Sequence, residues 1–259
     1  MSAGEKPAWL RAIRAEWAKG RRGGARKVAL VAPLPFCLLG LVAAGVFGGG
    51  GAGGAGFSTY GWNYWYVLML PVSVALITAS MASIDVRLGL RSVYGLPLDP
   101  ALSWWGKLAC CVVLVLASGC VMLAAATLAW VLGGGVAHPV LGAATVVVVT
   151  VGSSWMVPVG LALTLRLGTL AGIAVPVLAQ LVLSIALYDS GLWWALPPAA
   201  TLRLPAPLLA VAPSGIPLAW DDPMNLIEPE WGLAVAVALA VTGVLAWAGA
   251  RWFSQGEVR

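Results

Sequence analysis

The sequence predicts an all-α polytopic membrane protein with six transmembrane helices, on the basis of its long uncharged stretches and the one-sided placement of its basic residues. Of the 259 residues, 61% are hydrophobic and 10% are charged, whereas a soluble domain carries roughly 25% charged residues. No charged side chain occurs between Val28 and Ile84, and between Leu108 and Leu165 the only Asp, Glu, Lys, Arg or His is His138. Helices that are apolar on all sides over such lengths have to face lipid or one another.

Each predicted span has at least the roughly 17–25 apolar residues that a helix needs to cross a bilayer core of about 30 Å. The predicted spans cover residues 28–47, 64–84, 108–132, 139–165, 167–188 and 231–250. Pro71, Pro158 and Pro176 lie within spans, where we expect them to kink the helices.

The basic residues predict that both termini lie in the cytosol. With six spans and a cytosolic N-terminus, only Arg203 of the 15 basic residues falls on the outer side. Lys and Arg are enriched in cytoplasmic loops, so this count favours the orientation and the number of spans together. The basic residues lie in short tracts beside the spans, which is typical of contact with lipid headgroups and not with nucleic acid. The expected location is the bacterial cytoplasmic membrane.

The chain divides into a cytoplasmic tail (1–27), a single transmembrane domain (28–252) and a second cytoplasmic tail (253–259). In the first tail, Trp9, Ile13 and Trp17 recur with helical spacing, which predicts an amphipathic helix within residues 5–20 lying in the headgroup region. The alternative is a disordered basic tail.

Three connecting segments stand out. The aromatic cluster Tyr60, Trp62, Tyr64, Trp65 and Tyr66 predicts the outer interface at the start of the second span. The inner loop 85–107 is expected either to hold a short helix over 85–94 that a cytosolic partner grips or to be an ordinary connector, with Ser103 capping the next helix. The outer segment 189–230 carries eight prolines and apolar runs, which predicts a re-entrant or interfacial element without a seventh crossing.

The sequence offers no candidate catalytic, cofactor-binding or metal site. The predicted spans contain no Asp, Glu, Lys or Arg, the chain has one histidine, and it lacks the Gly-x-x-x-x-Gly-Lys-Ser/Thr motif of ATPases. The four cysteines, Cys37, Cys110, Cys111 and Cys120, fall inside predicted spans and fit no zinc spacing, so we interpret them as packing residues. We therefore expect a non-enzymatic bundle whose energy comes from elsewhere.

The chain resembles the membrane subunits of ABC-2-type exporters, and among them the short permeases of lantibiotic-immunity ABC transporters. The features that carry the resemblance are the basic lead-in 14–22 (RAEWAKGRR), the stretch 62–65 (WNYW) followed by Leu70-Pro71, the inner loop with Arg91, Leu96-Pro97, Trp104 or Trp105 and Lys107, and six spans in about 250 residues. The resemblance covers nearly the whole chain.

The resemblance implies an export subunit that works with a separate ATPase, which binds the ATP and Mg²⁺, and with a second permease, either a copy of itself or a related chain. It implies an elbow helix with Trp9, Ile13, Glu16, Trp17 and Lys19, and a coupling helix with Asp85, Arg87, Leu88, Arg91 and Tyr94 that meets the ATPase. The expected substrate is a lantibiotic-like peptide expelled for self-immunity, which is a form of antibiotic resistance. The alternatives are efflux of a small hydrophobic antibiotic or a lipid, and a non-transporting membrane scaffold or sensor.

Overall fold

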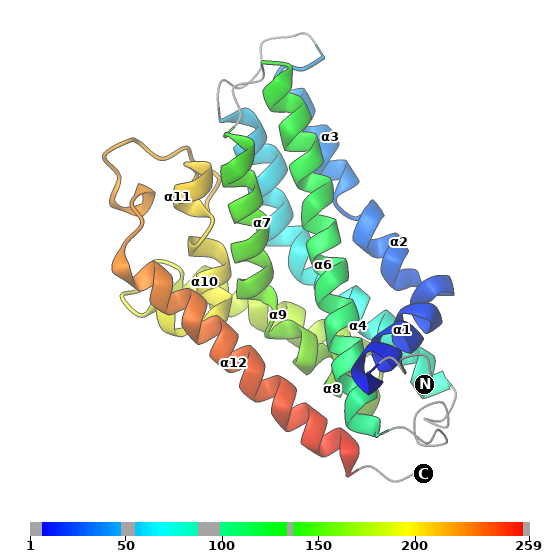
Figure 1. Ribbon diagram of the computed structural model, residues 1–259. Helices are drawn as coiled ribbons and strands as arrows, with labels where there is room; N and C mark the ends of the chain where they lie inside the picture. The colour runs from blue at the N-terminus through cyan, green and yellow to red at the C-terminus, as the bar shows by residue number, and fades with distance from the viewer. Residues whose placement is uncertain (1–6, 48–54, 88–98, 134–136, 256–259) are drawn as a thin grey trace, which may run out of the picture.

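The computed structural model describes residues 7–47, 55–87, 99–133 and 137–255, which form a bundle of helices (Figure 1). Across these ranges there is no β-strand, and the one isolated β-bridge joins Val211 to Pro217. The α-helices are α1 (Ala8–Lys19), α2 (Gly24–Val31), α3 (Leu34–Ala43), α4 (Leu70–Arg87), α6 (Pro100–Val131), α7 (Pro139–Ser153), α8 (Met156–Leu167), α9 (Thr169–Leu187), α10 (Pro197–Arg203), α11 (Ala206–Leu209) and α12 (Pro229–Ser254).

Five helical stretches in the described part of the chain are long and apolar enough to cross a bilayer, and a bent pair provides a sixth. The five are Gly24–Ala43, Ser58–Arg87, Pro100–Val131, Thr169–Leu187 and Pro229–Ser254. The bent pair is α7 and α8, whose axes differ by 42°. The prediction of an all-helical chain with several membrane-length apolar helices is therefore confirmed.

The bend between α7 and α8 follows from Pro158. Proline has no N–H group, so Pro158 cannot donate to the carbonyl of Ser154, four residues earlier. That carbonyl instead accepts from the amide of Val157 at 3.0 Å, in a tighter turn. The break between α2 and α3 lies at Ala32 and Pro33.

The core of the bundle lies along α4 and α6, and α9 and α12 lie at its periphery. We compare the fraction of buried residues in the most apolar part of each helical stretch. It is 56% for the stretch Ser58–Arg87, but only 22% for α9 and 22% for α12. The largest fully buried side chains include Trp62, Trp65 and Trp104. The exposed apolar faces of α9 and α12 are those a lipid environment accommodates.

The expected outer aromatic interface is partly wrong. Trp62, Trp65 and Tyr66 are buried in the core, and of the five aromatic residues Tyr64 is the most exposed, at 37%. The helix is π-helical over Ser58–Asn63 and Trp65–Met69. Because π-helical turns hold more residues than α-helical turns, these segments shift the side chains around the axis relative to an α-helix.

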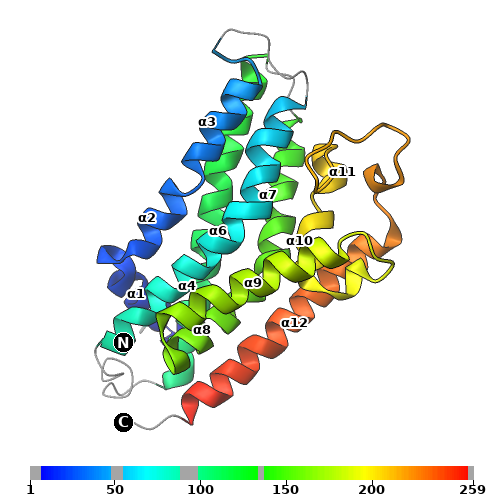
Figure 2. The same ribbon diagram turned by 180° about the vertical axis from the view of Figure 1, so that it is seen from behind.

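The segment 189–230, which the sequence predicts on the outer side, folds back into the bundle. Its helices α10 and α11 have 7 and 4 residues, too short to cross a bilayer, and α10 packs against α7, α9 and α12 (Figure 2). Gln180 of α9 donates to the carbonyl of Pro198 at 3.1 Å, and Trp231 of α12 donates to that of Leu204 at 3.1 Å. These side-chain donors tie the backbone of the proline-rich segment to α9 and α12.

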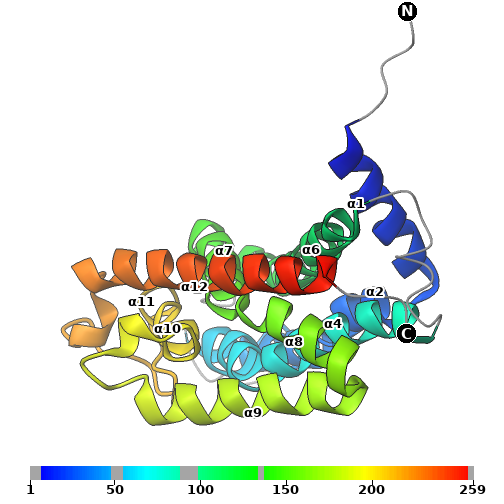
Figure 3. The same ribbon diagram turned by 90° about the horizontal axis from the view of Figure 1, so that it is seen from below.

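Helix α1 and the C-terminal end of α12 lie at the same end of the bundle (Figures 1 and 3). The start of α6 joins them. The indole N–H of Trp104 in α6 donates to the carbonyl of Ala246 in α12 at 2.9 Å, and its ring lies 5.7 Å from that of Phe253. Trp104 is completely buried, so this contact ties α12 firmly to α6 next to the place where α1 docks.

Candidate functional site

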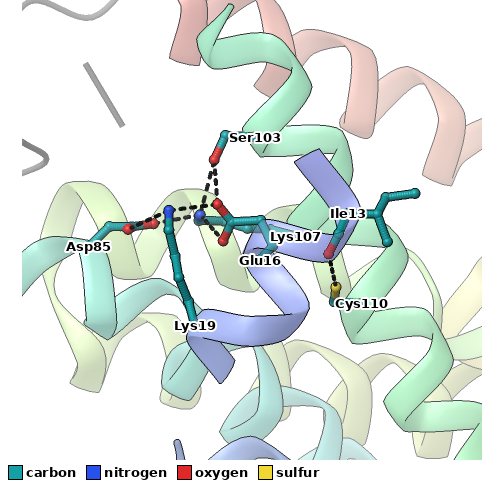
Figure 4. Close-up of polar contacts among 7 residues, drawn as sticks. All are labelled: Ile13, Glu16, Lys19, Asp85, Ser103, Lys107 and Cys110. Atoms are coloured by element: carbon teal, nitrogen blue, oxygen red, sulfur yellow. Dashed lines mark hydrogen bonds and ion pairs between the residues drawn. The ribbon is translucent and has the colours of Figure 1, made fainter. Parts of the chain in front are cut away.

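Four charged side chains and one serine are gathered at the end of the bundle where α1 meets α4 and α6 (Figure 4). We call this group the charge cluster. Its members are Glu16 and Lys19 of α1, Asp85 of α4, and Ser103 and Lys107 of α6. Two carboxylates and two ammonium groups make its formal charge zero.

Lys107 lies at the centre of the charge cluster. Its Nζ is 2.5 Å from Oε2 of Glu16 and 2.5 Å from Oδ2 of Asp85. The exposed fraction of the side chain is 0% for Lys107, 4% for Glu16 and 1% for Asp85. One buried cation therefore bridges two buried carboxylates from different helices.

Ser103 and Lys19 complete the coordination of the carboxylates. The hydroxyl of Ser103, one turn before Lys107 on α6, donates to Oε1 of Glu16 at 2.7 Å and accepts from Lys107 at 3.2 Å. Nζ of Lys19 lies 2.8 Å from Oε1 of Glu16 and 3.6 Å from Oδ1 of Asp85. Partial burial by itself lowers the pKa of Lys19, but the two carboxylates outweigh it and raise that pKa above its usual value.

Each buried charge of the charge cluster is stabilised by the opposite charges next to it. Removing a carboxylate or an ammonium group from water costs several kcal/mol per ion, and only close opposite charges and hydrogen bonds offset that cost. Each buried charge here has at least one opposite charge within 3.6 Å. Loss of Lys107 would leave Asp85 with only Lys19, at 3.6 Å, as a cation, so Lys107 is the member on which the attachment of α1, α4 and α6 to one another depends most.

Close backbone contact allows α1 to reach the charge cluster. Gly106 of α6 faces Ala12 of α1, and a Cβ atom at Gly106 would lie 3.3 Å from the carbonyl carbon of Ala12. The thiol of Cys110 is 3.8 Å from the carbonyl oxygen of Ile13. A side chain larger than hydrogen at position 106 would push α1 outward and lengthen the ion pairs of Glu16.

The structure has a helix within the predicted range 5–20, and the side of it that packs against the bundle is not the side that carries Trp9 and Trp17. Trp9 and Trp17 are exposed at 54% and 39%, as a helix in the headgroup region requires, whereas Ile13 is half-buried against the bundle. The side chains that dock are Ala12 and Glu16. The Arg26 guanidinium lies 4.4 Å from the centre of the Trp17 ring.

The residues expected to meet an ATPase are only partly within the described chain. Asp85 belongs to α4 and is buried in the charge cluster, so the expectation that it meets a partner at the surface is corrected. Arg87, two residues later, is exposed. Leu88, Arg91 and Tyr94 lie outside the described residues.

Sequence reasoning missed Lys107 and Ser103. It treated Lys107 as a topology signal and Ser103 as a helix cap, but α6 starts at Pro100 and is capped by Asp99, whose Oδ1 accepts from the amide of Ala101 at 2.9 Å. The sequence did contain a signal for the ion pair. Asp85 directly follows the apolar run 64–84, and Lys107 directly precedes the apolar run 108–132.

Comparisons with models of protein families, with curated proteins and with solved structures found no match.

The charge cluster has the character of a structural junction. Its two carboxylates are occupied by two ammonium groups and a hydroxyl, and among the described residues no group of three or more His, Cys, Asp or Glu could hold a metal ion. The charge cluster therefore fixes α1, α4 and α6 to one another. Helices α4 and α6, which follow each other along the described chain, are joined by the charge cluster.

Proposed function

We propose that this chain is the permease subunit of an ABC exporter powered by a separate ATPase. The observation that supports it best is the buried ion-pair junction of α1, α4 and α6. The Asp85–Lys107 ion pair joins α4 to α6, and Glu16 ties both to α1. A push from a partner on α4 or α6 would therefore move α1, α4 and α6 together as a rigid body, because the ion pairs hold these helices to one another.

The proposed orientation has both termini in the cytosol and six crossings, with α7 and α8 forming one bent span. Two features support it. Helix α1 and the C-terminal end of α12 lie at the same end of the bundle (Figure 1), as an even number of crossings requires. Arg26, Arg87, Arg166 and Arg251 lie in or beside helix ends that this orientation places in the cytosol, in keeping with the preference of basic residues for that side.

In the proposed cycle, ATP binding closes the ATPase dimer against the segment 88–98, and α4 and α6 rotate together with α1. A second permease, either a copy of this chain or a related one, completes the pathway. Residues 253–259 and the first tail remain on the cytosolic side.

The proposed substrate is an amphipathic, lantibiotic-like peptide. The outer segment 189–230 supports a cationic ligand, because it carries five carboxylates and only one basic residue, Arg203. Arg203 is itself held within 3.7 Å of Asp189 and of Glu228. The remaining negative charge attracts cations to this face of the bundle. Expulsion of such a peptide would protect the cell that makes it.

Co-purification tests the exporter proposal. The tagged chain is extracted from its native membrane in mild detergent, and the recovered proteins are identified by mass spectrometry. We expect a stoichiometric ATPase with a Gly-x-x-x-x-Gly-Lys-Ser/Thr motif. Recovery of this chain alone, in a detergent that keeps a known ABC complex intact, would contradict the proposal and favour a scaffold or sensor.

An epitope inserted after Gly51 tests the orientation. Residue 51 lies between the first and second predicted spans, so the proposed orientation places it outside the cell. We expect an antibody to label the epitope in intact cells, and an epitope appended after Arg259 to be labelled only after lysis. The reverse pattern would show that the orientation is inverted, and labelling of both from outside would rule out an even number of crossings.

A further inference from the structure

An apolar groove of about 300 Å³ lies between α8 and α12, on the surface of the bundle. Its walls include Pro158, Ala162 and Leu163 of α8, and Leu245 and Ala248 of α12. The volume falls at the lower end of the range seen for ligand-binding sites. In the membrane such a groove is open to lipid.

The bend and the small residues explain why the groove exists. Because α8 turns by 42° from the axis of α7, it does not follow the direction set by the first half of this span. At the groove itself, Ala162 and Ala248 have small side chains and Gly249 has none, which leaves space between the two helices. Gly249 cannot be larger, because a Cβ atom there would overlap the buried ring of Trp104.

One end of the groove is basic. Arg166, the exposed side chain near the C-terminal end of α8, lines the groove, with its guanidinium 5.6 Å from the ring centre of Trp252. Arg251, beside Trp252, is also exposed and lies 4.2 Å from the ring of Trp247. Within the described chain, neither guanidinium forms an ion pair with a carboxylate.

The two helices that line the groove, and α9 next to α8, carry no carboxylate at this end. Helices α8 and α9 contain no Asp or Glu, and the only one in α12 is Glu230, at the opposite end of that helix. When an arginine stacks on an aromatic ring, the ring covers one flat face of the guanidinium. The N–H groups point outward in the plane of the guanidinium and remain free to bind a phosphate.

We propose that the groove binds one anionic phospholipid, with an acyl chain between α8 and α12 and the headgroup phosphate at Arg166. The proposed orientation assigns this lipid to the cytoplasmic leaflet, where anionic headgroups meet basic residues. The proposal rests on the membrane placement of the chain and does not require the ATPase partner.

Charge complementarity favours a lipid over a second copy of this chain. Two copies related by a two-fold axis through this face would bring Arg166 and Arg251 of each close to those of the other. Like charges at a desolvated interface repel. A phosphate-bearing amphiphile satisfies both the apolar walls and the basic end.

Native mass spectrometry of the full chain tests the proposal. The protein is equilibrated with vesicles of equal parts palmitoyl-oleoyl phosphatidylglycerol and palmitoyl-oleoyl phosphatidylcholine, which have the same acyl chains and differ in the headgroup, anionic in the first and zwitterionic in the second. We expect the wild-type chain to retain phosphatidylglycerol about fivefold over phosphatidylcholine, the size of preference that one basic residue near an anionic headgroup provides. Arg166→Gln should remove the preference, and Ala248→Trp should fill the groove and abolish retention of this lipid.

Two matched variants control for non-specific effects. Val244→Trp adds the same ring to α12 at a position exposed at 65% and outside the groove, and Arg14→Gln removes an exposed arginine from α1. Both should behave as the wild type. Equal retention of the two lipids by the wild type, or an unchanged preference in Arg166→Gln and Ala248→Trp, would overturn the proposal.

The same spectra separate this proposal from the alternative of a protein interface and from the exporter proposal. A lipid-free dimer that dissociates in Ala248→Trp would show that the groove is an interface between copies, and would overturn the lipid site. Selective lipid retention by a chain that recruits no ATPase would leave the lipid site standing and contradict the exporter proposal alone.

Discussion

Replacing Lys107 with methionine is expected to destabilise the protein by about 3–5 kcal/mol, the cost of removing one partner from a buried ion pair. Methionine has similar length and no charge, so Glu16 and Asp85 would be left as buried carboxylates that retain Lys19 as their one cation. The side chain of Lys19 is 24% exposed and lies 3.6 Å from Asp85, so it compensates only in part. The measurement is reversible unfolding in mixed detergent micelles, followed by circular dichroism.

Two further variants make the measurement specific to charge pairing. Lys19→Met should cost less than about 1 kcal/mol, because a cation partly in water contributes little. The triple variant Glu16→Gln, Asp85→Asn and Lys107→Met should recover much of the loss, because no buried charge is then left without a partner. Stability of Lys107→Met within about 1 kcal/mol of the wild type would show that the carboxylates are solvated and that the charge cluster does not hold the helices together.

Replacing Arg91 with glutamate is expected to abolish transport while leaving insertion and folding intact. Within the proposed function, Arg91 belongs to the inner segment that meets the ATPase, and a reversed charge at such a contact costs several kcal/mol of complementarity. The readout is survival of a sensitive strain that produces this chain with its ATPase and is challenged with a lantibiotic. Tolerance should fall to the level of cells that lack the transporter.

The matched control for this variant is Arg91→Lys, which keeps the charge and should retain most of the tolerance. Membrane fractionation of both variants checks insertion, and co-purification of the ATPase checks binding. We expect Arg91→Glu to be present in the membrane at the wild-type level without bound ATPase. Wild-type tolerance of Arg91→Glu would remove this residue from the coupling surface.

The apolar runs determined where the membrane-length helices lie. The run predicted over 231–250 lies inside α12 (Pro229–Ser254), and the run over 139–165 coincides with the bent pair α7 and α8. This succeeded because a stretch of some 20 apolar residues has few alternatives to a helix in lipid, where every backbone group must be satisfied within the segment. The prolines at 197–229 excluded a further crossing for the same reason, and α10 and α11 are correspondingly short.

Only the tertiary structure determined whether the charged side chains next to these runs are exposed to water or buried in ion pairs. Asp85 and Lys107 lie just beyond the predicted spans 64–84 and 108–132, where a charged residue usually marks the point at which a helix leaves the membrane core. Here α4 and α6 continue past the apolar runs, and α1 covers their ends, so both side chains lose contact with water and pair with each other and with Glu16. The hydropathy of a residue is a property of that residue alone, whereas the burial of a charge depends on which opposite charge another helix brings within ion-pair distance.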